Sequence, residues 1–204
     1  EHPVTEKVSG IDIVAAQFTI ASGESIEHLK VEKNGYAVEV RITAERFELS
    51  NEGEINFIPN PGEITEYILP ENINVDIISM IDKNKQITPY YDSLIMQVIA
   101  RGPDRDTALD TMDDYLSKIK ITGVPTNILL VREVLKDDVF RKGIYNTAFL
   151  NGFLERIDMT ALIKKAESEA GVQNNLLSLD ALKIEGSDEI KVLSPSTGIF
   201  YRTP

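Results

Sequence analysis

The chain has 204 residues, of which 42% are hydrophobic and 26% charged, the composition of a soluble globular protein. Its net charge of −12 argues against nucleic acid as a partner, because binding to phosphates needs a basic surface. With no cysteine and two histidines, disulfides, thiolate zinc sites and histidine-rich metal sites are excluded. The apolar runs are too short to cross a bilayer and the first residues show no secretory pattern, so we expect no membrane partner and a cytoplasmic location.

The first predicted element is a helix between Ser9 and Gly23. Ser9 and Asp12 have the spacing of a capping box, with Asp12 in the place of the usual Glu. Apolar residues then recur at i, i+3 and i+7 from Ile11, and Gly23 marks the end of the helix. We expect Glu6 to support the helix terminus through the helix dipole.

Residues 36–43 predict a strand with two different faces. Apolar side chains occupy every second position from Tyr36 to Ile42 and point toward a core. The opposite face presents Glu39 and Arg41 next to each other, where the carboxylate can hold the guanidinium in place. Taken alone, this pattern also fits a solvated arginine that pairs with Glu39.

Residues 54–101 predict a series of strands and turns. Turn-forming residues cluster at 59–62 and again at 82–85, where we expect a hairpin turn. The predicted strands are 55–58, 64–69 and 75–80. Residues 93–100 are an apolar run with β-branched members, which fits either a strand or a segment that passes from helix to strand.

The second half of the chain begins with an amphipathic helix at Asp104. Its apolar stripe consists of Leu109, Met112, Leu116 and Ile119. Its other face carries Asp106, Asp110, Asp113 and Asp114. We interpret the acidic face as solvated and not as a calcium site, because helical spacing cannot wrap an ion as a loop does.

Further helices follow a break formed by glycine and proline. Thr126 is predicted to cap a helix that runs through Leu135. Residues 137–156 predict short helical turns, and Thr160–Ala170 predicts another helix, which Gly171 closes. From residue 172 the chain is rich in Gln, Asn, Ser and Asp, which is typical of a linker.

Several islands of the sequence resemble the biotin carboxylase family, and they occur in the family's order. They are Glu1-His2-Pro3-Val4-Thr5-Glu6, Gly35–Glu45, Phe57–Gly62, Tyr90–Ser93, Gly123–Asn127 and Asn146–Leu150. The segment Ser194–Pro204 resembles the opening of a bacterial biotin carboxyl carrier domain. Together the two resemblances imply a polypeptide in which carboxylase and carrier are fused.

These resemblances divide the chain into three parts. Residues 1–156 correspond to the C-terminal domain of a biotin carboxylase, 157–188 to a helix and linker, and 189–204 to the start of a carrier domain that is incomplete. The implied fold is α+β, with an antiparallel sheet of rudimentary barrel-sandwich hybrid type and packed helices. Since the first residue is not methionine, we expect a piece of a longer protein.

The resemblance also implies an activity and its residues. Enzymes of this family are ligases that use ATP, Mg²⁺ and bicarbonate to carboxylate a ureido nitrogen of carrier-bound biotin. On the family's pattern, Glu1 matches the general base and Arg41 the cation that stabilises the enolate-like oxygen of the ureido ring. Glu39 or Glu45 is expected to orient Arg41, and Asp92 to lie on the dimer-facing side of the site. The chain itself is predicted to hold no cofactor-binding and no metal-ligating residue.

The implied partners are other parts of the same enzyme system. They are the upstream ATP-grasp part, the biotin carboxyl carrier domain and a carboxyltransferase subunit. Since the ATP-grasp part is missing from these residues, we expect the chain alone to be inactive and to hold no biotin, ATP or Mg²⁺.

Four positions depart from the family pattern. Asp76 replaces an arginine and Ile73 an aromatic residue at positions of dimer contact, which predicts a monomer or a different association. Gln97 stands where lysine is common, and Thr43 where asparagine is usual. These two changes fit a divergent or acyl-CoA-specialised member.

Three assignments stay open. The preferred one is an acetyl- or acyl-CoA carboxylase, and hence fatty acid biosynthesis; a pyruvate or urea carboxylase is the rival. The third is a non-catalytic module for carrier docking or assembly, with Glu1 and Arg41 as relics. Without the family, Glu1 reads as a disordered terminal residue, and His2 and His28 as surface residues.

Overall fold

A computed structural model describes residues 2–50, 54–81 and 86–171 of the chain. Some predictions fall outside these residues. They concern Glu1, the hairpin turn at 82–85, and the linker and carrier-like end at 172–204.

The centre of the fold is an antiparallel sheet of three strands in the order β1-β8-β6. Its members are β1 (Tyr36–Thr43), β8 (Leu94–Gly102) and β6 (Val75–Ser79). The bounds of β1 are those that the alternation of its residues predicts. The segment 93–100, for which the sequence left two interpretations open, lies largely in the central strand β8. This strand pairs with a neighbour on each edge and is buried over most of its length.

Six shorter strands form two-stranded antiparallel ladders around this sheet. They are β2 (Glu45–Leu49) with β3 (Ile55–Pro59), β4 (Gly62–Glu63) with β7 (Gln86–Ile87), and β5 (Glu66–Ile68) with β9 (Lys120–Thr122). The strand predicted at 64–69 is thus shorter, because the chain turns between β4 and β5. Together with the helices, these strands confirm the predicted class of helices packed on antiparallel sheet.

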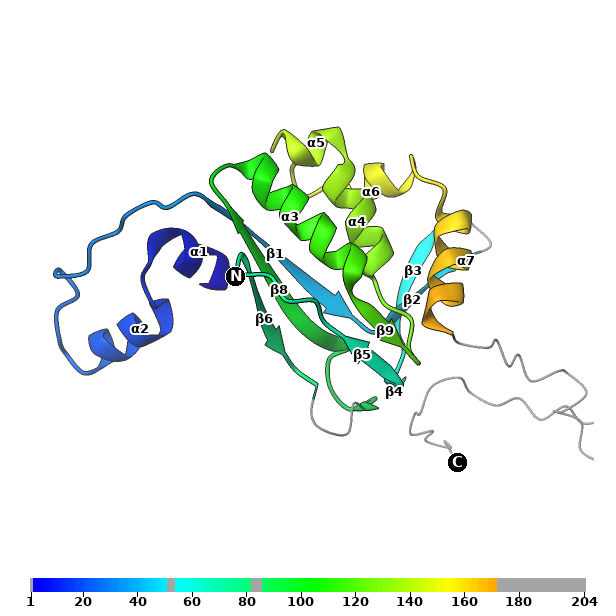
Figure 1. Ribbon diagram of the computed structural model, residues 1–204, viewed down its shortest axis with the longest axis horizontal. Coiled ribbons are helices and arrows are strands. Elements are labelled where there is room, and N and C mark those ends of the chain that lie inside the picture. The colour runs from blue at the N-terminus through cyan, green and yellow to red at the C-terminus, as the bar shows by residue number, and fades with distance from the viewer. Residues whose placement is uncertain (1, 51–53, 82–85, 172–204) are drawn as a thin grey trace, which may run out of the picture.

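Five helices make up the second half of the described chain. They are α3 (Arg105–Lys118), α4 (Ile128–Lys136), α5 (Asp138–Arg141), α6 (Phe149–Leu154) and α7 (Met159–Ala170). Helices α3 to α6 gather on one side of the central sheet, and α7 lies beside β2 and β3 (Figure 1).

The main hydrophobic core lies between α3 and the central sheet. Leu109, Met112 and Leu116 of α3 are buried in one cluster with Ile95 and Val98 of β8. This confirms the predicted stripe of α3. Burying each such side chain contributes about 1.5–3 kcal/mol, so the stripe is enough to fix the helix on the sheet.

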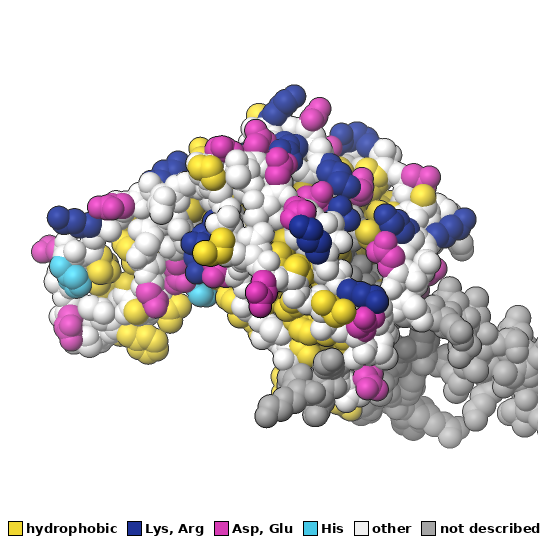
Figure 2. Space-filling view, in the orientation of Figure 1, with side chains coloured by type: hydrophobic (Ala, Val, Ile, Leu, Met, Phe, Trp, Pro, Cys, Tyr) yellow, Lys and Arg dark blue, Asp and Glu magenta, His cyan; other side chains and the backbone are white. Residues whose placement is uncertain are grey.

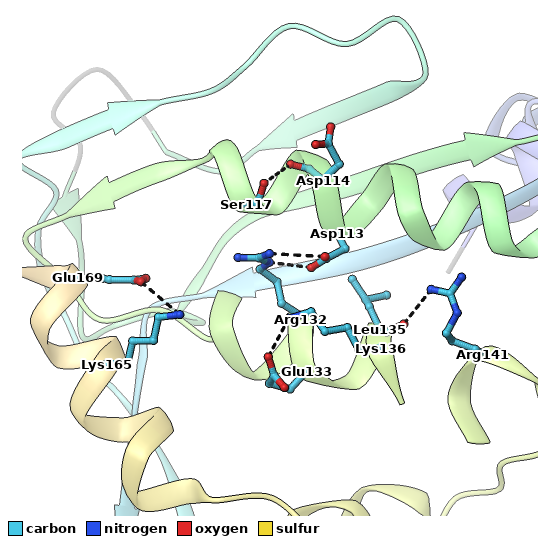
Figure 3. A network of polar contacts seen from close by, with 10 residues as sticks. All are labelled: Asp113, Asp114, Ser117, Arg132, Glu133, Leu135, Lys136, Arg141, Lys165 and Glu169. Carbon is cyan, nitrogen blue, oxygen red and sulfur yellow. Dashed lines mark hydrogen bonds and ion pairs between the residues drawn. The ribbon is translucent and has the colours of Figure 1, made fainter. Parts of the chain in front are cut away.

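Cations from neighbouring helices pair with the acidic face of α3, which stays mostly exposed to solvent as predicted. Arg132 of α4 donates to the two carboxylate oxygens of Asp113, at 2.7 and 3.5 Å (Figure 3). That hydrogen bond raises the pKa of Arg132. Arg141 of α5 contacts Asp106 at 3.0 Å and Asp110 at 2.9 Å. Among the described residues, no group of three or more His, Cys, Asp or Glu could hold a metal ion.

A second, smaller core joins α7 to the rest of the domain. Met159 of α7 is buried together with Phe47 of β2, Leu130 of α4 and Phe153 of α6. The helix ends as predicted at Gly171, which adopts the left-handed conformation with φ +64°. Helix α7 lies after the predicted boundary at residue 156, yet it packs on the domain that precedes this boundary.

The N-terminal region contains two helices where the sequence predicts one. They are α1 (His2–Ser9) and α2 (Ile13–Ala21), with Asp12 as the N-cap of α2. The capping box at Ser9 is therefore wrong, because the Asp12 carboxylate itself accepts from the Ala15 N–H at 2.7 Å. Glu6 accepts from the Ile13 N–H at 2.9 Å, so it does support the start of this helix.

The apolar side of α2 is exposed. The side chain of Phe18 is 74% accessible, and hydrophobic side chains gather over this helical pair in Figure 2. Figure 1 shows the pair projecting from one end of the sheet. No described helix has the length and apolarity that a transmembrane span requires.

The cap predicted at Thr126 is also wrong. Helix α4 starts at Ile128, so its N-cap position falls on Asn127, one residue later. The Asn127 side chain does not cap the helix, because it is hydrogen-bonded to β1 instead.

Candidate active site on the polar face of strand β1

Strand β1 places Arg41 and Glu39 on the same face, as its alternation predicts. The Arg41 Nε atom lies 3.8 Å from Glu39 Oε1. The Arg41 side chain is 60% exposed, whereas that of Glu39 is only 9% exposed. A nearly buried carboxylate therefore lies under an accessible guanidinium.

A side chain of the neighbouring strand β8 also contacts the Glu39 carboxylate. Gln97 is the cross-strand neighbour of Arg41, and its Nε2 donates to Glu39 Oε1 at 2.9 Å. By the resemblance, Gln97 is expected to stand where lysine is common in the family. The Gln97 amide carries no charge, whereas Arg41 is a cation that lies beside Glu39.

Glu45 and Asp92 line a cavity of about 340 Å³ together with Arg41. The Ser93 hydroxyl donates to Glu45 Oε1 at 3.1 Å. Asp92 Oδ1 accepts from the Leu94 N–H at 2.8 Å, so its carboxylate fixes the turn that starts β8. Of the five predicted site residues, the structure thus brings four together: Arg41, Glu39, Glu45 and Asp92.

Two further cavities adjoin the same strand. One, of about 340 Å³, has an apolar wall that includes Phe57, Leu130 and Val134. The other, of about 540 Å³, is lined by Val4 of α1, Arg105 of α3 and the rings of Phe140 and Tyr145. Arg41 borders all three cavities.

The second cation of this region, Arg105, was missed by the sequence analysis. Its guanidinium donates to the carbonyls of Arg141 at 2.9 Å and Phe140 at 2.8 Å. Its guanidinium carbon lies 5.5 Å from the centre of the Phe140 ring and 5.9 Å from that of Tyr145. The aromatic residues after 140 were the available signal, because arginine stacks readily on aromatic rings.

The fifth predicted residue, Glu1, lies outside the described residues. Its neighbour His2 is half-exposed, with Nδ1 3.2 Å from Glu6 Oε1. Val4 lines a cavity with Arg41, so helix α1 brings the first described residues to the polar face of β1. The described part of the chain presents no carboxylate cluster for Mg²⁺.

Comparison with known proteins identifies the class to which this fold and site belong. Residues 39–152 match the family described as "Biotin carboxylase C-terminal domain". The chain belongs to this family. The matched region contains Glu39, Arg41, Glu45 and Asp92, whereas α1, α2 and α7 lie outside it.

Two curated relatives show how far the similarity extends. A pyruvate carboxylase subunit of Methanothermobacter thermautotrophicus is 37% identical over 169 residues, 81% of this chain and 33% of the relative. Biotin carboxylase 1 of Bacillus subtilis is 40% identical over 155 residues, 75% of this chain and 33% of the relative. The chain therefore spans about a third of the length of these relatives.

Solved structures agree with this fold. The biotin carboxylase domain of Hydrogenobacter thermophilus 2-oxoglutarate carboxylase, in complex with MgADP, ADP and bicarbonate, is 36% identical with a TM-score of 0.65. That match covers 78% of this chain and 35% of the other. Pyruvate carboxylase of Rhizobium etli is 33% identical with a TM-score of 0.67, over 76% of this chain and 16% of the other.

Proposed function

We propose that this chain is the C-terminal part of the biotin carboxylase component of a biotin-dependent carboxylase. In the complete enzyme it would take part in the ATP- and bicarbonate-dependent carboxylation of carrier-bound biotin. The observation that carries the proposal is the position of Arg41, an accessible guanidinium on strand β1 that borders three cavities.

Arg41 has the properties that a stabiliser of developing negative charge needs. Its charge is permanent, its donors form a planar fork, and Glu39 lies where it can orient them. The apolar wall with Phe57 and Leu130 suits a ring system with little charge, such as that of biotin. Biotin supplies the ureido nitrogen that is carboxylated, and Arg41 is proposed to hold the oxygen of that ureido group.

The remaining roles follow from the resemblance and are part of the same proposal. Glu1 is the proposed general base, Glu39 and Glu45 support Arg41, and Asp92 lies at the edge of the site. Following the resemblance, we assign ATP and Mg²⁺ to an upstream ATP-grasp part of the complete enzyme, and propose that the chain alone is inactive.

The acyl acceptor belongs to a carboxyltransferase partner, and the carrier-bound biotin would link the two. We keep an acetyl- or acyl-CoA carboxylase in the cytoplasm as the preferred assignment. A pyruvate or 2-oxoglutarate carboxylase fits equally, because relatives with both names match this chain. The barrel-sandwich hybrid arrangement and the carrier-like end at 189–204 remain proposals of the same kind.

Replacement of Arg41 in the complete enzyme tests the function. Arg41→Ala should lower biotin carboxylation by about 100-fold or more, the usual effect of removing a donor to a developing oxyanion. Arg41→Lys should retain part of the activity, because it keeps the charge and loses the fork. Carboxylated biotin is measured with labelled bicarbonate.

Arg46→Ala is the matched control. Arg46 lies on β2 in a surface ion pair with Glu48 at 2.9 Å and borders none of the three cavities. It should change the rate by less than about twofold. Unchanged carboxylation by a folded Arg41→Ala enzyme would instead support the non-catalytic docking module.

A further inference from the structure

The side chain of Asn127 fastens the end of β1 on both sides of Ile42. Its Nδ2 donates to the carbonyl of Arg41 at 2.9 Å, and its Oδ1 accepts from the N–H of Thr43 at 3.1 Å. Its backbone N–H donates to the carbonyl of Thr43 at 3.3 Å. Three hydrogen bonds therefore join one residue to the backbone that carries Arg41.

This contact lies where the strand has least support of its own. Among the strands that the structure describes, β1 is at the edge of its sheet and pairs with β8 alone. The register of the β1–β8 ladder shifts between Ile42 and Thr43, so the regular pairing ends at Ile42, the residue that follows Arg41. A primary amide offers one carbonyl and N–H donors, and so it takes the place of a peptide group of a neighbouring strand.

The Asn127 side chain is turned away from the contact that its position favours. Asparagine is a preferred N-cap residue, and Asn127 is at the N-cap position of α4, yet it makes no side-chain cap. Asp104 and Asp158, at the same position of α3 and α7, do cap their helices. The amide is therefore used to connect α4 with β1.

We propose that Asn127 is a positioning residue for Arg41. The guanidinium is largely exposed and its ion pair with Glu39 spans 3.8 Å, so its location depends on the backbone from which it extends. A displacement of about 1 Å near a reacting group can cost about 100-fold in rate. This inference rests on the proposed function of Arg41.

The test measures how much biotin is carboxylated for each ATP hydrolysed by the complete enzyme. Arg41 is proposed to act on biotin and not on ATP, so a displaced Arg41 lowers this ratio, whereas a general loss of folded enzyme leaves it unchanged. Asn127→Ala should lower the ratio about tenfold, since it removes both side-chain hydrogen bonds.

Asn127→Asp distinguishes the proposed role from helix capping. Aspartate caps a helix as well as asparagine, but it has no donor for the Arg41 carbonyl. We expect this variant to lower the ratio like Asn127→Ala. A ratio equal to that of the unmodified enzyme would overturn the inference.

Asp158→Ala and Arg41→Ala complete the set. The first removes a true helix cap on α7, and should lower the melting temperature with an unchanged ratio.

If Asn127→Ala behaves in the same way while Arg41→Ala lowers the ratio, the positioning role is wrong and the function stands. If Arg41→Ala leaves the ratio unchanged, the proposed function fails, and the inference with it. The double variant Arg41→Ala/Asn127→Ala should be no worse than Arg41→Ala alone.

Discussion

Gly123 is a residue whose backbone leaves no room for a side chain. It adopts φ +98° in the turn between β9 and α4, and its N–H donates to the carbonyl of Ala170 at 2.9 Å. A Cβ atom there would meet the Glu63 carbonyl oxygen and lie 2.9 Å from the Thr65 nitrogen, both of them backbone atoms. The turn at Gly123 therefore packs against the segment between β4 and β5, and it is hydrogen-bonded to the end of α7.

We expect Gly123→Ala to destabilise the chain by more than about 1 kcal/mol, because the left-handed conformation and the backbone contacts both oppose it. Gly152→Ala is the control, since Gly152 is helical and a Cβ there meets nothing within 4 Å. It should leave stability unchanged or raise it by up to about 1 kcal/mol. Urea denaturation measures both; equal effects at the two glycines would contradict this account of the turn.

Residue patterns predict the individual side chains of this site only in part. The alternation of β1 places Glu39 beside Arg41 because both are neighbours on one strand. The contacts of Glu39 with Gln97 and of Arg41 with Asn127 join residues 58 and 86 positions apart. Such pairs depend on strand register and on where α4 begins, and neither is encoded in local periodicity.

At the scale of elements, the alternation of β1 was sufficient to predict its bounds, and the apolar stripe of α3 predicted its buried face. The last residue of that stripe, Ile119, lies after the end of the helix. Helix α1 was missed because it has only 8 residues, and its apolar residues Pro3, Val4 and Val8 are too few to predict a helix from periodicity. The start of α4 was missed because Thr126 and Asn127 are both good caps, and a long-range contact decides between them.

Helix α7 should contribute to the stability of the domain that precedes it. Met159 is 4% exposed in the cluster with Phe47, Leu130 and Phe153. Met159→Ala should cost about 2–4 kcal/mol in the free energy of unfolding, because it leaves a cavity in that cluster. Lys165→Ala on the exposed side of α7 is the control, with an expected change below about 0.5 kcal/mol.

Chemical denaturation of the two variants gives the comparison. Equal stability of Met159→Ala and the unmodified chain would mean that α7 does not hold this core together. The carboxylase domain would then end near residue 156, as the division of the sequence predicts.

At the scale of the whole molecule, the charge of Asp76 is engaged within its own chain. Asp76 Oδ2 lies 3.1 Å from Lys7 Nζ and 3.5 Å from Arg101 Nε. It thereby joins α1 to β6 and β8. Ile73, in the loop before β6, is 90% exposed. These are the two positions at which the resemblance predicts a departure from the family's dimer contacts.

We therefore predict that the chain sediments as a monomer at micromolar concentration, and that Ile73→Asp leaves its sedimentation coefficient unchanged. In a monomer Ile73 faces water, so its replacement by aspartate breaks no contact between chains. A dimer that Ile73→Asp dissociates would show instead that this surface is the usual family interface. Sedimentation velocity of both chains separates the two results.

Because three cavities meet at Arg41, this one side chain limits how many ligands the surface can bind at the same time. The Arg41 side chain extends from a single position on β1. Its N–H donors can all point into one cavity, or they can be divided among several cavities with fewer hydrogen bonds in each. Two small anions in different cavities would therefore compete for the Arg41 guanidinium without contacting each other. We therefore expect binding in one cavity to weaken binding in another, because both draw on the same guanidinium.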